Sequence, residues 1–181
     1  DTDDFLNTVD SVGAIAVPTH VEMIDWGLTE DLMYTIWPCE NIESLTKLLK
    51  HHTTFEPEVA ISICREIAIA LENIYYEAGI GHYNLSSHNI YLDGQGKTRF
   101  SDAGHAAFLF HDSNFQDAEF DIYNRHYLSP EIAYDWSTPD IRSDMYSLGC
   151  CLYAMVTGKL PFGHRGPQTE QDYANFGLSK P

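Results

Sequence analysis

The sequence predicts an α+β domain in which two long apolar helices are combined with short β-hairpins. Three observations lead to this prediction. A mostly apolar run from Glu56 to Ala78 has the length and composition of a buried helix. A second run of this kind extends from Asp144 to Thr157. Pairs of short segments rich in β-branched and aromatic residues, separated by turn-forming residues, indicate hairpins before and between these helices.

The first fifty residues predict a helix, a hairpin and a second helix. Apolar residues at spacings of one, three and four predict a short amphipathic helix over residues 3–16. The segments His20–Trp26 and Leu32–Trp37 predict two strands joined by a turn that starts at Gly27. Ile42–Lys50 suits a helix, because its leucines fall on one face.

The long helix that follows has clear start and stop signals. Pro57 and neighbouring acidic residues belong in a first turn, and Gly79 marks the end. Apolar residues surround the helix axis more completely than a surface helix requires, so we expect a buried spine of the domain. These residues are Val59, Ile61, Ile63, Ile67, Ile69, Leu71 and Ile74.

The second half of the chain predicts a hairpin, a long loop and a helix. The strands are Asn89–Leu92 and Thr98–Ser101, joined by a Gly-rich turn. Residues 105–127 lack a clear period and predict a long ordered loop of the functional kind. The helix Asp144–Thr157 ends at Gly158. Without an internal repeat or linker, a single domain is expected.

Composition narrows the possible functions. The 181 residues include 27 acidic and 10 basic ones, a formal charge of −17, which argues against nucleic-acid binding. Four cysteines without CxxC spacing predict reduced thiols, and the nine histidines show no metal-ligand spacing. No signal peptide or membrane-spanning run is evident, so we expect a soluble, cytoplasmic protein.

The residues most informative about chemistry are the stretch 82–92 and the triplet Asp102–Gly104. Their order and spacing resemble a protein kinase, in which a catalytic loop HRDLxxxN precedes a strand pair and then DFG. The matching residues are His82, Asn89, Asp102 and Gly104. The segment Tyr127–Glu131 resembles the family's APE segment, and residues 143–162 resemble the helix after it. Four matches in the right order make this a specific signal.

The resemblance covers nearly the whole chain and implies one truncated kinase-like domain. Residues 1–37 correspond to a remnant of the N-lobe, and residues 38–181 to the hinge and C-lobe. The family's Gly-rich loop and phosphate-binding Lys would precede Asp1, and its last helices would follow Pro181. The resemblance therefore implies mainly a helical C-lobe with short hairpins and an incomplete N-lobe.

The chain departs from the family at the residues that transfer phosphate. Asn84 stands where the family's catalytic Asp accepts the substrate proton, and an amide oxygen has almost no basicity. Ser86 replaces a Lys that neutralises the transferred phosphoryl group, so a cation is lost as well. Tyr83 replaces the Arg that pairs with a phosphorylated loop, and Asn124 replaces a Thr that aligns the substrate.

The nucleotide site is retained in part. Asn89 and Asp102 match the family's Mg²⁺ ligands, so the resemblance allows weak or vestigial Mg-ATP binding at most. The alternative is that local hydrogen bonds hold both side chains with no metal.

The resemblance also assigns the residues around the adenine. Trp37 falls at the gatekeeper position and Tyr91 on the adenine-pocket floor, where two large rings would fill the space. Cys39 and Glu40 fall in the hinge. Occluded or very weak nucleotide binding is therefore expected, with no cofactor required.

Several motif residues have structural roles in the family. By the resemblance, His82 hydrogen-bonds beneath the loop, and Asp144 caps the loop backbone. Glu131 pairs in the family with an Arg that would lie beyond Pro181, so here it stays unpaired or finds another cation.

Two functions follow from these departures. The first is a pseudokinase that binds or scaffolds, with impaired or absent phosphoryl transfer. The alternative is part of an active ATP-dependent serine/threonine kinase whose N-lobe is missing from this chain. The partner is expected to be an unidentified protein. Alternatively, a homodimer would bury the exposed apolar surface that faces the missing N-lobe.

Overall fold

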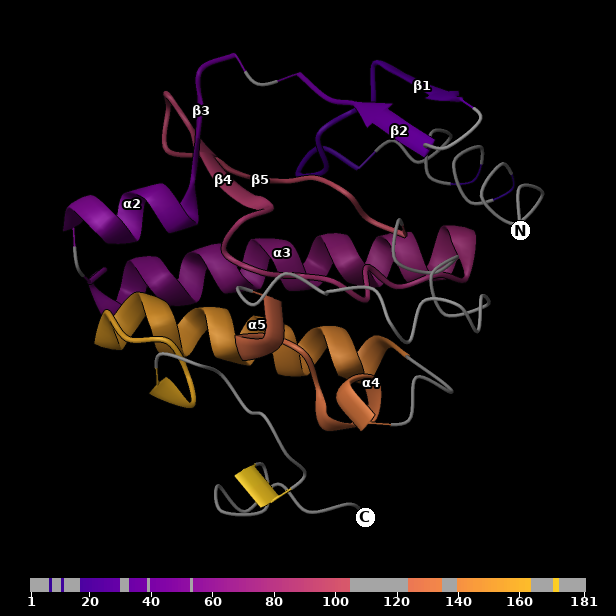
Figure 1. The fold of residues 1–181 in the computed structure, drawn as a ribbon. Coiled ribbons are helices and arrows are strands. Elements are labelled where there is room, and N and C mark those ends of the chain that lie inside the picture. Colours follow the sequence, from indigo (N-terminus) through magenta and orange to yellow (C-terminus); the bar gives the residue numbers. More distant parts are fainter. Residues whose placement is uncertain are drawn as a thin grey trace.

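In the computed structural model of the chain, the described residues are 17–29, 33–38, 40–52, 54–104, 124–134 and 140–163, with Asn7, Ser11, Gln171 and Asp172. They form an α+β domain, as the sequence predicts (Figure 1). The strands are β1 (Asp25–Leu28), β2 (Met33–Ile36), β3 (Ile42–Ser44), β4 (Ile90–Asp93) and β5 (Thr98–Phe100). The helices are α2 (Leu45–His52), α3 (Pro57–Ala78), α4 (Pro130–Tyr134), α5 (Ile141–Thr157) and the 3₁₀ turn η3 (Asn124–His126).

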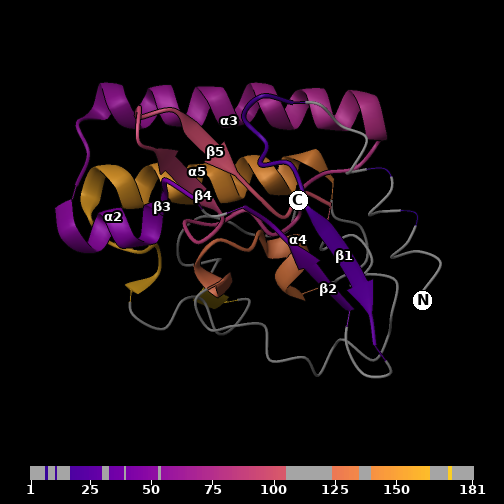
Figure 2. The same ribbon diagram turned by 90° about the horizontal axis from the view of Figure 1, so that it is seen from above.

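Two long helices form the base of the domain. α3 and α5 run side by side in both ribbon views (Figures 1 and 2), and residues of both helices contribute to one apolar core. α3 begins at Pro57 and ends at Gly79, whose left-handed φ of 69° lets its N–H donate to the Tyr75 carbonyl at 2.9 Å. The predicted bounds of this helix are therefore confirmed.

Burial around α3 is less complete than expected. Ile63, Ile67 and Leu71 are buried against α5 and the sheet. Val59, Ile61 and Ile69, by contrast, are about half exposed, at 47%, 57% and 48%. The prediction of a helix buried all round was wrong in this respect, because neighbouring elements cover only one face of α3 among the described residues.

A three-stranded antiparallel sheet in the order β3-β4-β5 lies over the helical base (Figures 1 and 2). β4 and β5 form the hairpin expected from the sequence, with Ile90 opposite Phe100. β3 pairs with β4, Ile42 lying opposite Asp93. The prediction of a helix from Ile42 was wrong for its first turn, because this pairing draws Ile42–Ser44 into the sheet and α2 starts only at Leu45.

The first hairpin is also confirmed, with shifted bounds. β1 pairs with β2 antiparallel, Asp25 lying opposite Ile36. His20 makes only an isolated bridge with Phe100, so only Asp25 and Trp26 of the predicted strand His20–Trp26 belong to β1. Gly27, which was predicted to start the turn, is also part of β1.

The remaining predicted elements are described only in part. Within residues 3–16 only Asn7 and Ser11 are described, and both are helical. Residues 105–123 of the expected loop lie outside the described residues. α5 begins three residues before the predicted start, because the Asp140 side chain caps it by accepting the Arg142 N–H at 2.7 Å. In the described part of the chain, no helix is long and apolar enough to cross a membrane.

Candidate functional site

The loop of residues 82–89 connects the helical base to β4 and is anchored from below by Asp144 of α5. The Asp144 carboxylate accepts the N–H of His82 and the N–H of Tyr83, each at 2.7 Å. The His82 ring lies 2.9 Å, through Nε2, from the carbonyl of Ser101. Both structural roles expected for His82 and Asp144 are therefore present.

Asp144 lies in an unusual electrostatic setting. The side chain is fully buried, and this burial raises the pKa of Asp144 to about 7, although the two backbone N–H groups oppose the shift. Gly81 lies directly beside it, and a Cβ at Gly81 would come within 2.6 Å of the Asp144 carboxylate. The carboxylate therefore occupies a tight, dry space beneath the loop.

The loop is closed on itself by the amide of Asn89. Its Oδ1 accepts the N–H of Ser86 at 2.8 Å, and its Nδ2 donates to the carbonyl of Asn84 at 2.9 Å. Ser86 is almost completely buried, and its hydroxyl accepts the N–H of His88 at 3.2 Å. Ser86 thus stabilises the turn and does not extend toward a ligand.

Asn84 contributes its backbone, and not its amide, to this network. Its N–H lies 3.4 Å from the His82 ring, and its carbonyl accepts from Asn89. No hydrogen bond joins the half-buried Asn84 side chain to any residue that the structure describes. Its amide is therefore available for a ligand, but as a neutral group.

A second set of hydroxyls holds the loop from the other side. The Ser87 Oγ accepts the phenolic hydrogen of Tyr127 at 2.8 Å and lies 2.6 Å from the Thr46 hydroxyl. The carbonyl of Tyr127 in turn accepts from Ser147 of α5 at 2.7 Å. These bonds join α2, the loop and α5, which lie far apart in sequence.

Glu131, in α4, has a partner of a different kind from the one expected. Its carboxylate accepts the hydroxyl of Ser143 at 2.6 Å. Among the described residues, a neutral hydroxyl is therefore its direct partner, and the charge of Arg142 acts on it without direct contact.

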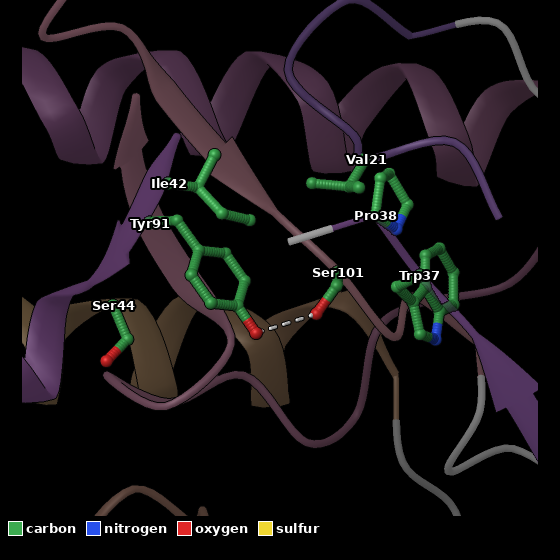
Figure 3. Close-up of a pocket in the computed structure, with 7 residues that line it drawn as sticks. All are labelled: Val21, Trp37, Pro38, Ile42, Ser44, Tyr91 and Ser101. Atoms are coloured by element: carbon green, nitrogen blue, oxygen red, sulfur yellow. Dashed lines mark hydrogen bonds between the residues drawn. The ribbon is translucent and has the colours of Figure 1, made fainter. Parts of the chain in front are cut away.

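A pocket of about 210 Å³ opens between the sheet and the chain that follows β2 (Figure 3). Figure 3 shows the rings of Trp37 and Tyr91 on opposite sides of the lining. The other described lining residues are Val21, Pro38, Ile42, Ser44 and Ser101. None of these seven residues carries a charge, and the volume is below the roughly 300–1,000 Å³ of typical ligand pockets.

The structure therefore brings together only some of the residues predicted for the nucleotide. Trp37 and Tyr91 line the pocket. Glu40 is exposed and is not among the described lining residues, and Cys39 lies outside the described residues.

The pocket is linked to Asp102 through Ser101. The Tyr91 hydroxyl lies 3.3 Å from the Ser101 Oγ, and Ser101 donates to the Asp102 carboxylate at 3.0 Å. Burial, with a smaller contribution from the Asp102 charge, holds the pKa of the Tyr91 phenol above its usual value. Tyr91 is therefore a protonated hydrogen-bond donor at neutral pH.

Comparison with known proteins identifies the family. A model of the protein kinase domain matches residues 3–178, nearly the whole chain. The chain belongs to the protein kinase family. The α+β architecture, with helices below and small antiparallel sheets above, fits a kinase domain with a partial N-lobe.

This kinase domain is similar to bacterial serine/threonine kinases. It is 32% identical over 165 residues to a probable serine/threonine-protein kinase of Clostridium perfringens, covering 91% of this chain and 24% of that protein. It is 29% identical to the serine/threonine-protein kinase PrkC of Bacillus subtilis, with 87% and 24% covered. It is 30% identical to the serine/threonine-protein kinase PknB of Mycobacterium leprae, with 87% and 26% covered. The chain spans about a quarter of the length of these curated relatives.

Kinases use Mg²⁺, and the two candidate ligands in this kinase domain, Asn89 and Asp102, are partly engaged in hydrogen bonds within the chain. Mg²⁺ prefers near-octahedral oxygen coordination that includes one or two carboxylates. Here the Asn89 amide is engaged at both ends within the loop, and one Asp102 oxygen accepts from Ser101. No group of three or more His, Cys, Asp or Glu able to hold a metal occurs among the described residues.

Sequence reasoning missed the serines that organise this kinase domain. Ser87, Ser101, Ser143 and Ser147 are all buried and all hydrogen-bonded. Only Ser147 carries a signal in the sequence, because it stands within an apolar stretch, where a buried hydroxyl needs a partner. The partners come from distant segments, so the pattern alone does not name them.

Proposed function

We propose that this kinase domain is a pseudokinase that works as a binding or scaffolding module, with impaired or absent phosphoryl transfer. The observation that carries the proposal is the neutral amide of Asn84 at the position of the family's catalytic carboxylate. An amide oxygen can orient a hydroxyl but cannot take its proton. The Asn84 side chain also has no hydrogen bond to a described residue that would alter its chemistry.

Charge around the site supports the same proposal. Ser86 is neutral and buried where the family carries a Lys, and no described residue lining the pocket is cationic. A polyphosphate would therefore enter a chain of formal charge −17 without a described cation to receive it. Removing one preorganised electrostatic group typically slows an enzyme by about 10²–10³-fold, so losing the base and the Lys together leaves little transfer.

The test is incorporation of labelled γ-phosphoryl into a general protein substrate by the purified chain with Mg-ATP. We expect no incorporation above background and no rise of the melting temperature. Asn84→Asp restores the carboxylate but not the cation, so we expect little recovery; Asn73→Asp, on the exposed side of α3, controls for the added charge. Rapid incorporation by the unaltered chain would contradict the proposal.

The second candidate function is that of an active ATP-dependent serine/threonine kinase of which this chain is a part. The observation in its favour is the identity of about 30% to proteins described as serine/threonine kinases. It requires Asn84 to orient the hydroxyl while water removes the proton. Strong stabilisation of the chain by Mg-ATP that Asp102→Ala abolishes would favour this candidate.

A protein partner is part of the first proposal, and we propose a second copy of the chain as that partner. The β1-β2 hairpin presents exposed apolar side chains at Ile24, Tyr34 and Ile36. Among the described residues, β1 and β2 pair only with each other, and the free edge of such a ribbon can accept another strand. Sedimentation velocity tests this point: we expect a dimer that Ile36→Asp dissociates, and a monomer at all concentrations would exclude it.

A further inference from the structure

The carboxylate of Asp102 is held by neighbouring hydroxyls in this structure. Its Oδ2 accepts from Ser101 at 3.0 Å, and the Ser101 Oγ also lies 3.3 Å from the Tyr91 hydroxyl. Figure 3 shows Tyr91 extending across the pocket toward Ser101. Tyr91 is in β4 and Ser101 directly follows β5, so two strands of one sheet supply the two hydroxyls.

The directions of these hydrogen bonds follow from the chemistry of the groups. An ionised carboxylate only accepts, so the single hydroxyl hydrogen of Ser101 points to Asp102. The Ser101 oxygen is then left as an acceptor, and Tyr91 must donate to it. The arrangement is a directed relay from Tyr91 to Ser101 to Asp102.

The Ser101 hydroxyl is well placed to link Tyr91 to Asp102, because hydrogen-bonding partners hold both the N–H and the carbonyl of Ser101. Its N–H donates to the carbonyl of Asn89 at 3.0 Å, and its carbonyl lies 2.9 Å from the His82 ring. The whole residue is buried. A hydroxyl on such a rigid support loses little additional conformational freedom when it bonds to a neighbour.

Asp102 needs such support because of its backbone. Its φ of 66° lies in the left-handed region, which costs free energy for a residue with a Cβ. The hydrogen bond from Ser101 is the support that the structure shows for this carboxylate among the described residues.

We propose that Tyr91 and Ser101 are positioning residues whose hydroxyl relay holds the Asp102 carboxylate in place of a metal ion. The site is then ordered without Mg²⁺ or nucleotide, as a module that only binds requires. This inference rests on the proposed non-catalytic function and assigns it a structural basis. The Tyr91 link is longer than the usual 2.7–2.8 Å of O–H···O bonds, so it is the weaker of the two.

A double-mutant cycle tests the relay. Urea unfolding is measured in EDTA for the unaltered chain, Tyr91→Phe, Asp102→Ala and the double variant. No direct hydrogen bond joins the Tyr91 and Asp102 side chains, so packing alone predicts additive effects on the unfolding equilibrium constant, whereas the relay predicts a coupling of at least about threefold. The backbone strain at Asp102 is present on both sides of the cycle and cancels.

Two controls identify Ser101 as the link. The coupling should disappear when the cycle is repeated in a Ser101→Ala background. Tyr76→Phe replaces Tyr91→Phe in the matched cycle and should be additive with Asp102→Ala, because Tyr76 is 79% exposed on α3. Additive behaviour of Tyr91→Phe and Asp102→Ala would overturn the relay. If Asp102→Ala does not fold, Asp102→Asn replaces it in the cycle with Tyr91→Phe, because it removes the negative charge toward which the Ser101 hydroxyl donates.

Binding of Mg²⁺ is tested by the same urea unfolding with MgCl₂ in place of EDTA. We expect an unchanged urea midpoint for the unaltered chain. A midpoint that rises with Mg²⁺, and does not rise in Asp102→Ala, would overturn the inference. Its outcome is separable from that of the proposed function: additive cycles without phosphoryl transfer refute only the relay, and phosphoryl transfer with intact coupling refutes only the pseudokinase role.

Discussion

Two regions of this kinase domain differ in how completely their polar groups are buried and hydrogen-bonded. The helical base consists of α3, α5 and the buried side of the 82–89 loop, where Asp144 and Ser87 hold the chain in place. The pocket face consists of Asn84 and the pocket lined by Trp37 and Tyr91. The Asp144 and Ser87 side chains of the base are buried and hydrogen-bonded, whereas the pocket face presents neutral groups and a small cavity.

This difference shows that a fold and its chemistry can be maintained separately. The base holds the loop through hydrogen bonds from Asp144 to the backbone of His82 and Tyr83, and none of these bonds involves the side chain of Asn84. On the pocket face, Asn84 and Ser86 are the neutral residues on which the proposed loss of phosphoryl transfer rests. The four predictions below test this contrast through stability.

The largest effect is expected in the base, at Asp144. Asp144→Ala leaves the N–H groups of His82 and Tyr83 buried without acceptors, at about 1–3 kcal/mol each, so we expect a loss of about 4 kcal/mol of unfolding free energy. Urea denaturation measures it. The matched control is Asp140→Ala, which removes a helix cap and a solvent-exposed ion pair with Arg142 and should cost about 1 kcal/mol. Equal costs for the two variants would contradict the contrast.

The pH dependence of stability should report the burial of Asp144. Its pKa is about 7 in the folded chain against an ordinary 3.8, so between these values the folded state binds the extra proton. Its contribution is fully present below pH 3.8 and is lost as the pH rises through about 7. The slope is at most about 1.4 kcal/mol per pH unit.

Other carboxylates titrate in the same range, so Asp144→Asn serves as the reference. The unfolding free energy of the unaltered chain, minus that of Asp144→Asn, should fall from pH 4 to pH 7. A difference that stays constant or rises over this window would show that Asp144 remains ionised throughout.

A smaller effect is expected for Ser87→Ala, which leaves the buried Tyr127 hydroxyl without its acceptor. We expect a loss of about 1–3 kcal/mol in urea denaturation. Adding Tyr127→Phe removes the stranded hydroxyl and should recover part of this loss. A double variant that loses the sum of both single effects would show that the hydrogen bond between them contributes nothing.

The smallest effect is expected on the pocket face. Asn84→Ala should change the unfolding free energy by no more than about 0.5 kcal/mol, because its amide has no hydrogen bond to a described residue. Asn89→Ala is the matched amide, and it should cost clearly more because it releases both Ser86 and Asn84. If Asn84→Ala were as costly as Asn89→Ala, Asn84 would belong to the structural base.

The parts of the fold that the sequence predicted well are those with local signals. The bounds of α3 followed from Pro57 and Gly79, and the β4-β5 hairpin from its Gly-rich turn. Prediction failed where the structure of a residue depends on the segment that pairs with it or covers it. Ile42 has a helical pattern locally but joins β3 because β4 pairs with it. Val59 has a core-type side chain, yet it is about half exposed because the described neighbours cover only part of it.

The candidate site divides in the same way. The motif order was sufficient to place His82, Asn89 and Asp102 near one another and to show that Asn84 has no carboxylate. It did not show that the Asn89 amide closes the loop or that Ser101 holds Asp102. Whether these residues can hold Mg²⁺ therefore depends on their hydrogen bonds as well as on their residue types.

The sequence by itself determined which chemical groups this kinase domain possesses, because a residue's basicity and charge belong to its side chain. The amide at Asn84 and the hydroxyl at Ser86 are fixed in this sense. Only the tertiary structure decided which groups are engaged, because hydrogen bonds such as those of Ser87 and Ser101 form between segments that meet only in the folded chain.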